Sequence, residues 1–324
     1  MADVTVTYMG LSLPNPLVVS SSSLTQTPEK VQQCEAAGAG AVVLKSLFEE
    51  QIEAEIDADS GGTEHTEAMD YIRQMQTDAG MTAYTRLIRE SRKLVSIPVI
   101  ASINAVSRDW WEDHVAALED AGADALELNI SLMPHDYTNR DEQILQFYVK
   151  TVEAVRKRVS IPISVKIGPQ FTSLPATVDA LTWAGASAVV LFNRFYQFDI
   201  DVEKLSLTSG SPFSTSADLS VPLRWISMIH GRSKAELAAS SGVHSGADAV
   251  KVLLAGAQVA QVCSALYRHG LEHLGVMRKE LESWMDRKSF TAVNQFRGKL
   301  SQKKSDTPVA FERLQYIKAL VGRE

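Results

Sequence analysis

The sequence predicts a (β/α)8 barrel, a closed ring of eight parallel strands surrounded by helices, as one domain over residues 1–324. Two short sequence motifs, each repeated along the chain and called phrases below, support this prediction. One is a small-Gly-small turn before a short apolar run, and the other is a Ser-Ile-Pro turn before such a run. Strands that are apolar on both faces and alternate with helical patterns indicate a parallel sheet with covered faces. Eight such units favour closure into a barrel over a doubly wound open sheet.

The first phrase occurs four times, and each copy contains Ala-Gly-Ala. A glycine between small residues is typical of a helix end, and the apolar, β-branched run behind it is typical of a buried strand. The four strands predicted in this way are residues 41–45, 125–129, 188–193 and 259–264.

The second phrase, Ser-Ile-Pro, stands at residues 96–98 and 160–162. Proline suits the first residue of a strand, where the ladder needs no N–H from it. Strands are therefore expected at residues 99–102 and 163–166, and Leu17–Ser20 and Ala235–Ser240 bring the number to eight.

Further elements are expected at the two ends of the chain. Val4–Tyr8 and Leu11–Leu13 flank Met9-Gly10 and predict a hairpin that plugs the floor of the barrel. Apolar residues at helical spacing predict two C-terminal helices, one with Leu271, Leu274, Met277, Leu281 and Trp284, the other with Phe311, Leu314, Ile317 and Val321.

The composition narrows the class of protein. Hydrophobic residues make up 45% of the chain, and no apolar run approaches the roughly 20 residues that cross a bilayer. A net charge of −7 argues against a nucleic-acid surface. The first residues lack the pattern of a signal peptide, and Cys34 and Cys263 form no CxxC pair. We therefore expect reduced cysteines and a cytoplasmic location, with no nucleic acid or membrane as partner.

Polar side chains gather where the predicted strands end, which is where barrels of this type place their active sites. The set contains two lysines, three asparagines and several hydroxyls, with no histidine or carboxylate at a strand end, so it is a poor metal site. Asparagine offers a donor and an acceptor together, which suits a flat heterocycle with amide edges. The residues are Ser20–Ser23, Lys45-Ser46, Ser102, Asn104, Asn129, Lys166, Asn193, Ser240–Gly242 and Ser264.

The sequence also predicts a phosphate-binding site beside this set. Ser240–Val243 follows the seventh strand, Ser245-Gly246 opens the next helix, and Ser264 follows the eighth strand. Backbone N–H groups in such loops bind phosphate in many barrels, although Gly242-Val243 alone is also compatible with a simple tight turn. A heterocycle and a phosphate together indicate flavin mononucleotide (FMN) as the cofactor. A capping role for the asparagines and a surface role for the lysines is the alternative.

The motifs together resemble the dihydroorotate dehydrogenase family nearly from end to end. They are Asn15-Pro16 before a serine run, Lys45-Ser46, Asn104, Leu126–Asn129, Val165-Lys166, Asn193, Gly242-Val243 and Gln295–Leu300. The resemblance implies a (β/α)8 barrel that binds FMN and oxidises dihydroorotate to orotate in pyrimidine biosynthesis. It also implies a homodimer, because the soluble class-1 members are dimers or larger assemblies.

The resemblance also assigns roles to residues. Lys45 would hold a substrate carboxylate, Lys166 would stabilise the reduced flavin, and Asn129 and Asn193 would contact a substrate amide. The residues that match FMN contacts are Ser20, Ser21, Lys45, Ser46, Asn104, Asn129, Lys166, Asn193, Ser241, Gly242, Val243, Cys263 and Ser264.

The chain departs from the family in its catalytic loop. The family reads Asn-x-Ser-Cys/Ser-Pro-Asn, with Cys or Ser as the base, and here Leu132 stands in the position of the base. An alkyl side chain cannot accept a proton. Ser131, His135 or Tyr137 could replace it, because the loop is offset by one residue.

Three further departures concern the loops. The family's substrate loop has no match between Ser60 and Tyr84, and Ser22 stands in place of a glycine. Ser214–Ser220 and then Pro222–Trp225 replace a double-glycine stretch, so Arg224 is a candidate for a second anion contact.

The expected function is therefore that of an FMN oxidoreductase acting on the CH–CH bond of a small substrate, such as a carboxylate heterocycle other than dihydroorotate. Two alternatives stay open: an active dihydroorotate dehydrogenase with a rearranged base, and a non-catalytic protein that binds FMN or a metabolite. A barrel with a phosphate ligand and no flavin would leave Asn104, Asn129 and Asn193 unexplained.

Overall fold

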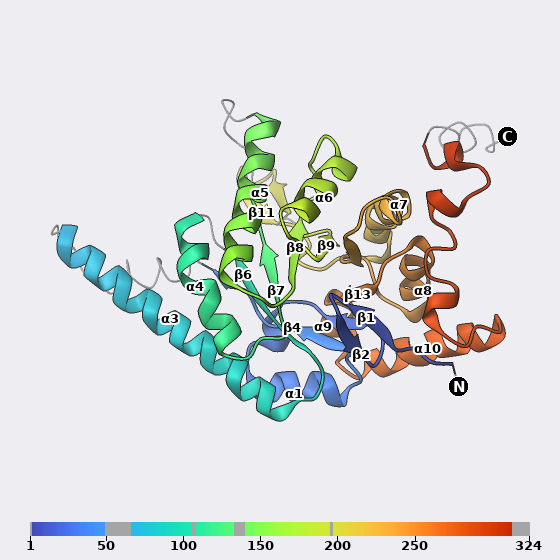
Figure 1. Cartoon of the computed structure of the whole chain (residues 1–324), viewed down its shortest axis with the longest axis horizontal. Helices are drawn as coiled ribbons and strands as arrows, with labels where there is room; N and C mark the ends of the chain where they lie inside the picture. The colour runs from blue at the N-terminus through green and yellow to red at the C-terminus, as the bar shows by residue number, and fades with distance from the viewer. Residues whose placement is uncertain (1, 49–65, 105–107, 133–139, 195–196, 313–324) are drawn as a thin grey trace.

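The computed structural model describes residues 2–48, 66–104, 108–132, 140–194 and 197–312. Its centre is a ring of eight parallel strands (Figure 1). The ring closes where Val42 pairs with Val99, so the chain forms a TIM barrel and not an open sheet. The strands are β3 (Leu17–Val19), β4 (Ala41–Val43), β6 (Val99–Asn104), β7 (Ala125–Asn129), β8 (Ile163–Ile167), β9 (Ala188–Leu191), β12 (Glu236–Ala239) and β13 (Val259–Val262). All eight predicted strands are confirmed, and a short β5 (Leu47–Phe48) extends the ring beside β6.

Helices surround the ring, and their apolar faces form one large core with the outward-facing strand residues. They are α1 (Pro28–Ala36), α3 (Thr66–Leu94), α4 (Arg108–Asp120), α5 (Asp141–Arg158), α6 (Leu174–Trp183), α7 (Ser220–Ile229), α8 (Gly246–Ala255), α9 (Ser264–His269) and α10 (His273–Arg287). In the part of the chain that the structure describes, no helix has both the length and the apolar content needed to span a bilayer.

The Ala-Gly-Ala phrase ends a helix in the same way each time. Gly256, for example, has a φ of +124°, and the N–H of Ala257 donates to the carbonyl of Val252. This is the hydrogen bond of a Schellman cap, which needs a left-handed residue. A Cβ on Gly256 would lie 2.1 Å from Cγ of His230, so packing also demands glycine there.

The Ser-Ile-Pro phrase is clamped by charged side chains from two helices. The carboxylate of Glu119, at the end of α4, accepts from the backbone N–H groups of Ser160 and Ile161, and Arg156 Nη1 donates to the carbonyl of Ile161 at 3.0 Å. Glu35 and Arg92 hold Ser96 and Ile97 in the same way. In each clamp the glutamate ties the end of its helix to the start of the second strand of the eight-stranded ring that follows in the chain, β8 for Glu119 and β6 for Glu35.

The predicted hairpin forms from β1 (Val6–Tyr8) and β2 (Leu11–Leu13), with Val6 opposite Leu13. It packs against the inward-facing strand residues at the floor of the barrel, including Ala125 and Ala188. Tyr8 is buried, and burial raises its pKa well above the ordinary value, with a further contribution from the negative charge of Glu127. The phenol therefore stays neutral below the polar layer described in the next subsection.

The first of the two predicted C-terminal helices is confirmed as α10, in which Leu274, Met277 and Leu281 are fully buried. Phe311 ends a short 3₁₀ turn (Pro308–Phe311). The other apolar residues of the second predicted helix, Leu314, Ile317 and Val321, lie outside the described residues.

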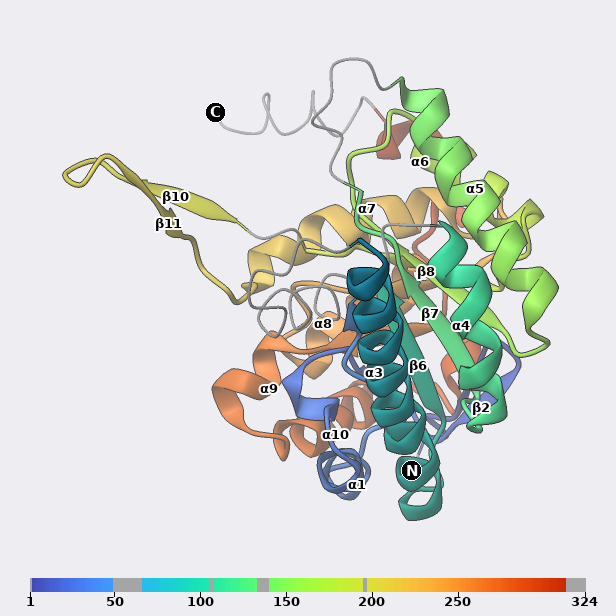
Figure 2. The same cartoon turned by 90° about the vertical axis from the view of Figure 1, so that its left-hand side faces the viewer.

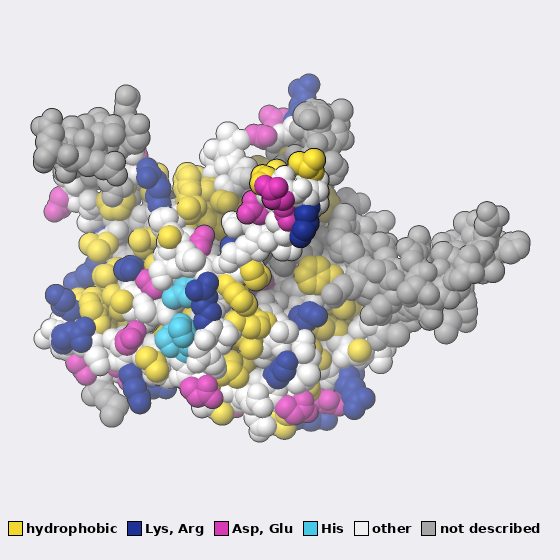
Figure 3. All heavy atoms as spheres, turned by 180° about the vertical axis from the view of Figure 1, so that it is seen from behind, with side chains coloured by type: hydrophobic (Ala, Val, Ile, Leu, Met, Phe, Trp, Pro, Cys, Tyr) yellow, Lys and Arg dark blue, Asp and Glu magenta, His cyan; other side chains and the backbone are white. Residues whose placement is uncertain are grey.

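A two-stranded arm, not predicted from the sequence, projects from the barrel after β9 (Figure 2). It consists of β10 (Phe198–Asp201) and β11 (Ser206–Ser209), and Ile200 lies opposite Leu207. Alternation along the strands places Phe198, Ile200 and Leu207 on one face and Asp199 and Asp201 on the other. The apolar face is exposed, with Leu207 72% accessible. Figure 3, from the side opposite to Figure 1, shows yellow and magenta side chains together on this arm, which points toward the viewer.

Candidate active site

A cavity of about 210 Å³ opens at the carboxyl ends of β3, β8, β9, β12 and β13. Most of the lining residues carry hydroxyl, amide or cationic groups, and Pro212, Val243 and Cys263 complete the wall. The lining residues are Ser20, Ser21, Lys166, Asn193, Arg194, Pro212, Ser214, Ser240, Ser241, Gly242, Val243, Gln261, Cys263 and Ser264.

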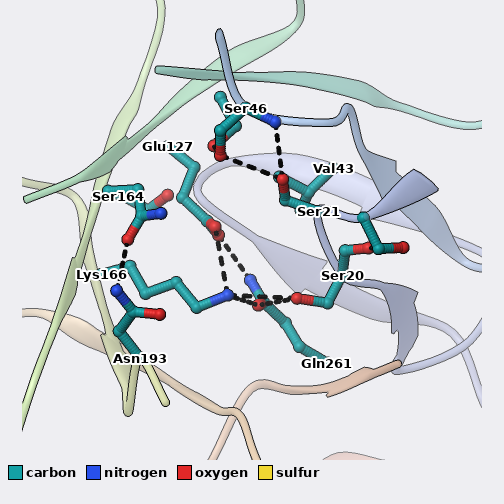
Figure 4. Close-up of polar contacts among 12 residues, drawn as sticks. Ser20, Ser21, Val43, Ser46, Glu127, Ser164, Lys166, Asn193 and Gln261 are labelled. Carbon is teal, nitrogen blue, oxygen red and sulfur yellow. Dashed lines mark hydrogen bonds and ion pairs between the residues drawn. The ribbon is translucent and has the colours of Figure 1, made fainter. Parts of the chain in front are cut away.

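The floor of the cavity is a buried polar network centred on Lys166 (Figure 4). Lys166 Nζ donates to Ser20 Oγ at 3.1 Å and to Gln261 Oε1 at 3.0 Å. Gln261 Nε2 in turn donates to Glu127 Oε2 at 2.5 Å. The second carboxylate oxygen of Glu127 lies 3.6 Å from Lys166 Nζ, as an ion pair.

A chain of hydroxyls joins the ends of β3, β4 and β6. Ser21 Oγ lies 3.0 Å from Ser46 Oγ and accepts from the backbone N–H of Ser46 at 2.8 Å. Ser46 Oγ lies 2.7 Å from Ser102 Oγ. Tyr84 on α3 supports this row from behind, because its hydroxyl donates to the carbonyl of Ser102 at 2.8 Å. Two of the predicted residues, Ser21 and Ser46, are thus brought together.

The two predicted substrate asparagines also meet. Asn129 ends β7, Asn193 follows β9, and Asn193 Nδ2 donates to Asn129 Oδ1 at 2.8 Å. Asn104 ends β6 and is buried. Lys45 follows β4 and is half-buried, and its backbone N–H donates to the carbonyl of Thr25 at 3.4 Å. Lys45 does not line the cavity described above.

The predicted phosphate loop has a constrained backbone. Ser241 and Gly242 have φ values of +74° and +77°, and a Cβ on Gly242 would lie 2.1 Å from the backbone N of Leu219. The N–H of Gly242 points to Ser214 Oγ at 3.4 Å, and the N–H of Ser214 donates to Ser264 Oγ at 3.0 Å. The loops after β12 and β13 therefore meet the loop that follows the arm.

Two titratable groups border this loop. Burial raises the pKa of the Cys263 thiol, so it stays protonated and is a poor nucleophile. Burial, helped by the positive charge of Arg268, lowers the pKa of His244, whose Nε2 lies 3.2 Å from Ser214 Oγ. The imidazole is therefore neutral near pH 7.

The catalytic-loop residues occupy different surroundings. Ser131 is exposed, and Leu132 is half-buried against the main core. Leu132 lines a second cavity of about 240 Å³ with Ile144, Tyr148 and Phe171. His135 and Tyr137 lie outside the described residues.

Arg224 does not join the predicted site. It lines a separate groove between α7, α8 and the C-terminal segment, and its Nη2 donates to the carbonyls of Phe311 and Glu312. A role for Arg224 as a second anion contact in the cavity is therefore wrong.

Four residues of the site escape prediction from the sequence: Glu127, Arg194, Ser214 and Gln261. Glu127 and Gln261 stand between apolar neighbours in the strand runs Leu126–Leu128 and Ala260–Val262. Polar residues that alternate with apolar ones along a strand face one side together. That alternation is the available signal for a polar barrel interior.

The model of one protein family, described as Dihydroorotate dehydrogenase, matches residues 3–285. The chain belongs to the dihydroorotate dehydrogenase family. Among relatives, the chain is 26% identical to the dihydroorotate dehydrogenase B (NAD(+)) catalytic subunit of Methanothermobacter thermautotrophicus, over 89% of this chain and 95% of the relative. The protein of the same name from Methanocella arvoryzae is 28% identical, over 88% and 94%. The chloroplastic dihydropyrimidine dehydrogenase (NADP(+)) of Arabidopsis thaliana is 23% identical, over 91% and 76%.

Family and relatives together support an oxidoreductase of the dihydroorotate dehydrogenase type. The relatives include enzymes named for two related substrates, dihydroorotate and dihydropyrimidines. Membership of the family thus leaves the substrate of this chain open.

Proposed function

We propose that this dihydroorotate dehydrogenase-like protein is an FMN-dependent oxidoreductase that removes hydrogen from a CH–CH bond of a small cyclic amide or carboxylate other than dihydroorotate. The observation that carries the proposal is the buried Lys166 ammonium at the floor of a cavity rich in hydroxyl and amide groups. A buried cation whose hydrogen bonds go to neutral groups, Ser20 and Gln261, suits a flat ligand that gains negative charge on reduction.

The residues present fit FMN at both of its ends. At one end Gly242 tolerates no Cβ and its N–H points to Ser214 Oγ, while the N–H of Ser214 donates to Ser264 Oγ. Such N–H groups and hydroxyls are the usual ligands of a phosphate. At the other end, Lys166 and the pair Asn129–Asn193 supply donors and acceptors for the ring and for a substrate amide.

When bound, FMN supplies the two-electron acceptor that the amino-acid side chains lack. Lys166 would then stabilise the negative charge of the reduced cofactor, and Asn129 and Asn193 would orient the substrate. Lys45 is assigned the substrate carboxylate, because it follows β4 at the same end of the barrel. Ser131 and His135 are the proposed proton acceptors in place of Leu132.

Leu132 supports a substrate other than dihydroorotate. Its side chain lines the second cavity with Ile144 and Phe171, and it has no group that accepts a proton. Ser131 is exposed, so among the described residues of this loop a hydroxyl is accessible at the neighbouring position.

The test is an anaerobic titration of the purified protein, followed by its visible spectrum. We expect a yellow protein whose flavin band is bleached by dithionite and left unchanged by dihydroorotate, with dihydrouracil as a second donor to try. Arg224→Ala is the matched control, because it removes a cation from the separate groove and should leave the spectrum unaltered.

Two outcomes would contradict the proposal in different ways. Bleaching by dihydroorotate would make the protein an active dihydroorotate dehydrogenase with a rearranged base, and Ser131→Ala would then be the next variant. A colourless protein that takes up no added FMN would remove the cofactor and with it the proposed reaction.

We also propose that the protein is a homodimer, and that the arm is part of the interface. The exposed apolar face of β10 and β11 supports this, since two-stranded ribbons are marginally stable on their own and large exposed apolar faces mark contact surfaces. The family resemblance favours a second copy of this chain as the partner.

A further inference from the structure

Glu127 is a buried carboxylate that the chemistry of the proposed function leaves without a role. It is 1% exposed and lies at the middle of β7, on the face that points into the barrel together with Ala125 and Asn129. Burying a carboxylate costs several kcal/mol unless cationic and hydrogen-bonding partners surround it. The residue therefore needs an explanation from its contacts.

Glu127 is connected to Lys166 through the side-chain amide of Gln261 and not by a direct hydrogen bond. Gln261 stands between the two charges: its Oε1 accepts from Lys166 Nζ, and its Nε2 donates to Glu127 Oε2. The ammonium and the carboxylate are 3.6 Å apart at Oε1, which is beyond hydrogen-bond length. Among the described residues, Oε1 has no hydrogen-bond partner.

The neutral partners thus hold Lys166 close to Glu127 without letting the two groups join. Two of the three ammonium hydrogens go to Ser20 and Gln261, and both acceptors fix the nitrogen at the floor of the cavity (Figure 4). An ammonium has three donors, so one remains for a bound ligand.

The groups below Glu127 do not offset its charge. Burial raises the pKa of Tyr8 well above the ordinary value and that of Tyr84 above it as well, and the charge of Glu127 acts on both in the same direction. Both phenols are therefore neutral at physiological pH. In the part of the chain that the structure describes, Lys166 is the cation paired with Glu127.

We propose that Glu127 is a positioning residue, which holds the Lys166 ammonium at the flavin through Gln261. Its negative charge also offsets the positive charge that Lys166 presents to the reduced ring. This rests on the proposed FMN site. Reduction of bound FMN to its anionic form takes up two electrons and one proton from the reductant and adds one negative charge beside Lys166. With Glu127 ionised, the pair is neutral before reduction; with glutamine in its place, the site carries one positive charge.

Glu127→Gln should therefore favour the reduced flavin. We expect the ratio of the dissociation constants of oxidised and reduced FMN to rise about tenfold, which for a two-electron couple is a shift of about +30 mV in midpoint potential. The measurement is a dye-coupled potential titration with dithionite as reductant, together with fluorescence titration of oxidised FMN into apoprotein.

Glu236→Gln is the matched control. Glu236 begins β12 at the floor of the barrel and accepts from the backbone N–H of Met9 at 2.6 Å, so its loss removes the same charge from the opposite end of the strands. The potential of this variant should equal that of the wild type. Glu127→Asp, which retains the charge, should restore most of the wild-type potential.

A double-mutant cycle separates the positioning role from a merely structural one. In a Lys166→Met background, Glu127→Gln should change the ratio of the dissociation constants of oxidised and reduced FMN by less than about threefold. The reason is that the cation through which Glu127 acts is gone. If Glu127→Gln does not fold, Gln261→Met provides the test: without its spacer, Lys166 joins Glu127 and the ratio should fall several-fold.

The failures are distinguishable. A protein that binds no FMN would overturn the proposed function and the inference together. A protein that binds FMN with the same potential in the wild type and in Glu127→Gln, or in the wild type and in Gln261→Met, would overturn the inference alone.

Discussion

Gly242, in the proposed phosphate loop, is a position where the absence of a side chain is required by the backbone. Its backbone is left-handed, and a Cβ added to it would lie only 2.1 Å from the backbone N of Leu219, so every other residue is excluded. Ser241, also left-handed, is a polar residue that carries this strain beside it.

Gly242→Ala should destabilise the fold by about 2–5 kcal/mol, from left-handed strain and from displacement of the Leu219 backbone. FMN affinity should fall at least about tenfold, because the N–H of residue 242 moves. Urea unfolding and flavin fluorescence measure the two effects.

Gly10→Ala is the matched control for this substitution. Gly10 has the same φ of +77°, but a Cβ there meets nothing within 4 Å. Its loss should therefore cost only the backbone strain and leave FMN affinity unchanged. Equal effects of the two substitutions would mean that the close approach to Leu219 has no importance.

At the scale of elements, the sequence pattern is most informative where a local rule acts. The strands after Ala-Gly-Ala are placed correctly because the left-handed glycine and the apolar run act within one short segment. The arm escapes prediction because Phe198–Glu203 alternates apolar and acidic residues, residues 204–209 are mostly polar, and neither strand has a buried face. Its strand pairing becomes visible only in three dimensions.

The candidate site follows the same division. Lys166, Asn129 and Ser46 can be found from the sequence because strand ends converge in any parallel barrel. Glu127 and Gln261 cannot, because each looks like a lone polar residue in an apolar strand, and their partnership spans 134 residues of sequence. No local pattern connects two such positions.

Because Glu119 holds the Ser-Ile-Pro turn, the stability of the fold should depend on pH in the acidic range. Burial raises the pKa of Glu119, but the hydrogen bonds from Ser160 and Ile161 outweigh it, so the net pKa is lowered. A carboxylate with a lowered folded-state pKa contributes stability that is present above the unfolded value of about 4.3 and is lost as the pH falls through the folded value.

Glu119→Gln should therefore lower the free energy of unfolding by about 1 kcal/mol near pH 7, and the difference from the wild type should shrink below about pH 4. Urea unfolding at a series of pH values measures it. Glu90→Gln is the control, since its pair with Arg86 is exposed and its loss should leave the free energy of unfolding nearly unchanged. A difference that grows toward acid pH would contradict the assignment.

At the scale of the whole molecule, the proposed homodimer depends on the arm. Leu205 is 88% exposed and Leu207 72%, so both are available to a partner. Leu205→Ser combined with Leu207→Ser should convert a dimer to a monomer, which light scattering behind a sizing column detects.

Thr208→Ser on the opposite face of the arm is the control and should leave the dimer intact. A wild-type protein that is monomeric at tens of micromolar would contradict the assembly, and so would a dimer that survives the double substitution.

The close fit between Gly242 and the backbone of Asp218 and Leu219 also limits how this barrel can be recombined. Loops on a barrel are usually exchanged one at a time, since each follows its own strand. Here residues 214–219 and 240–243 interlock through Ser214, so a transplanted segment from a relative would bring an unmatched neighbour. Laboratory chimaeras should therefore exchange both segments as a single module.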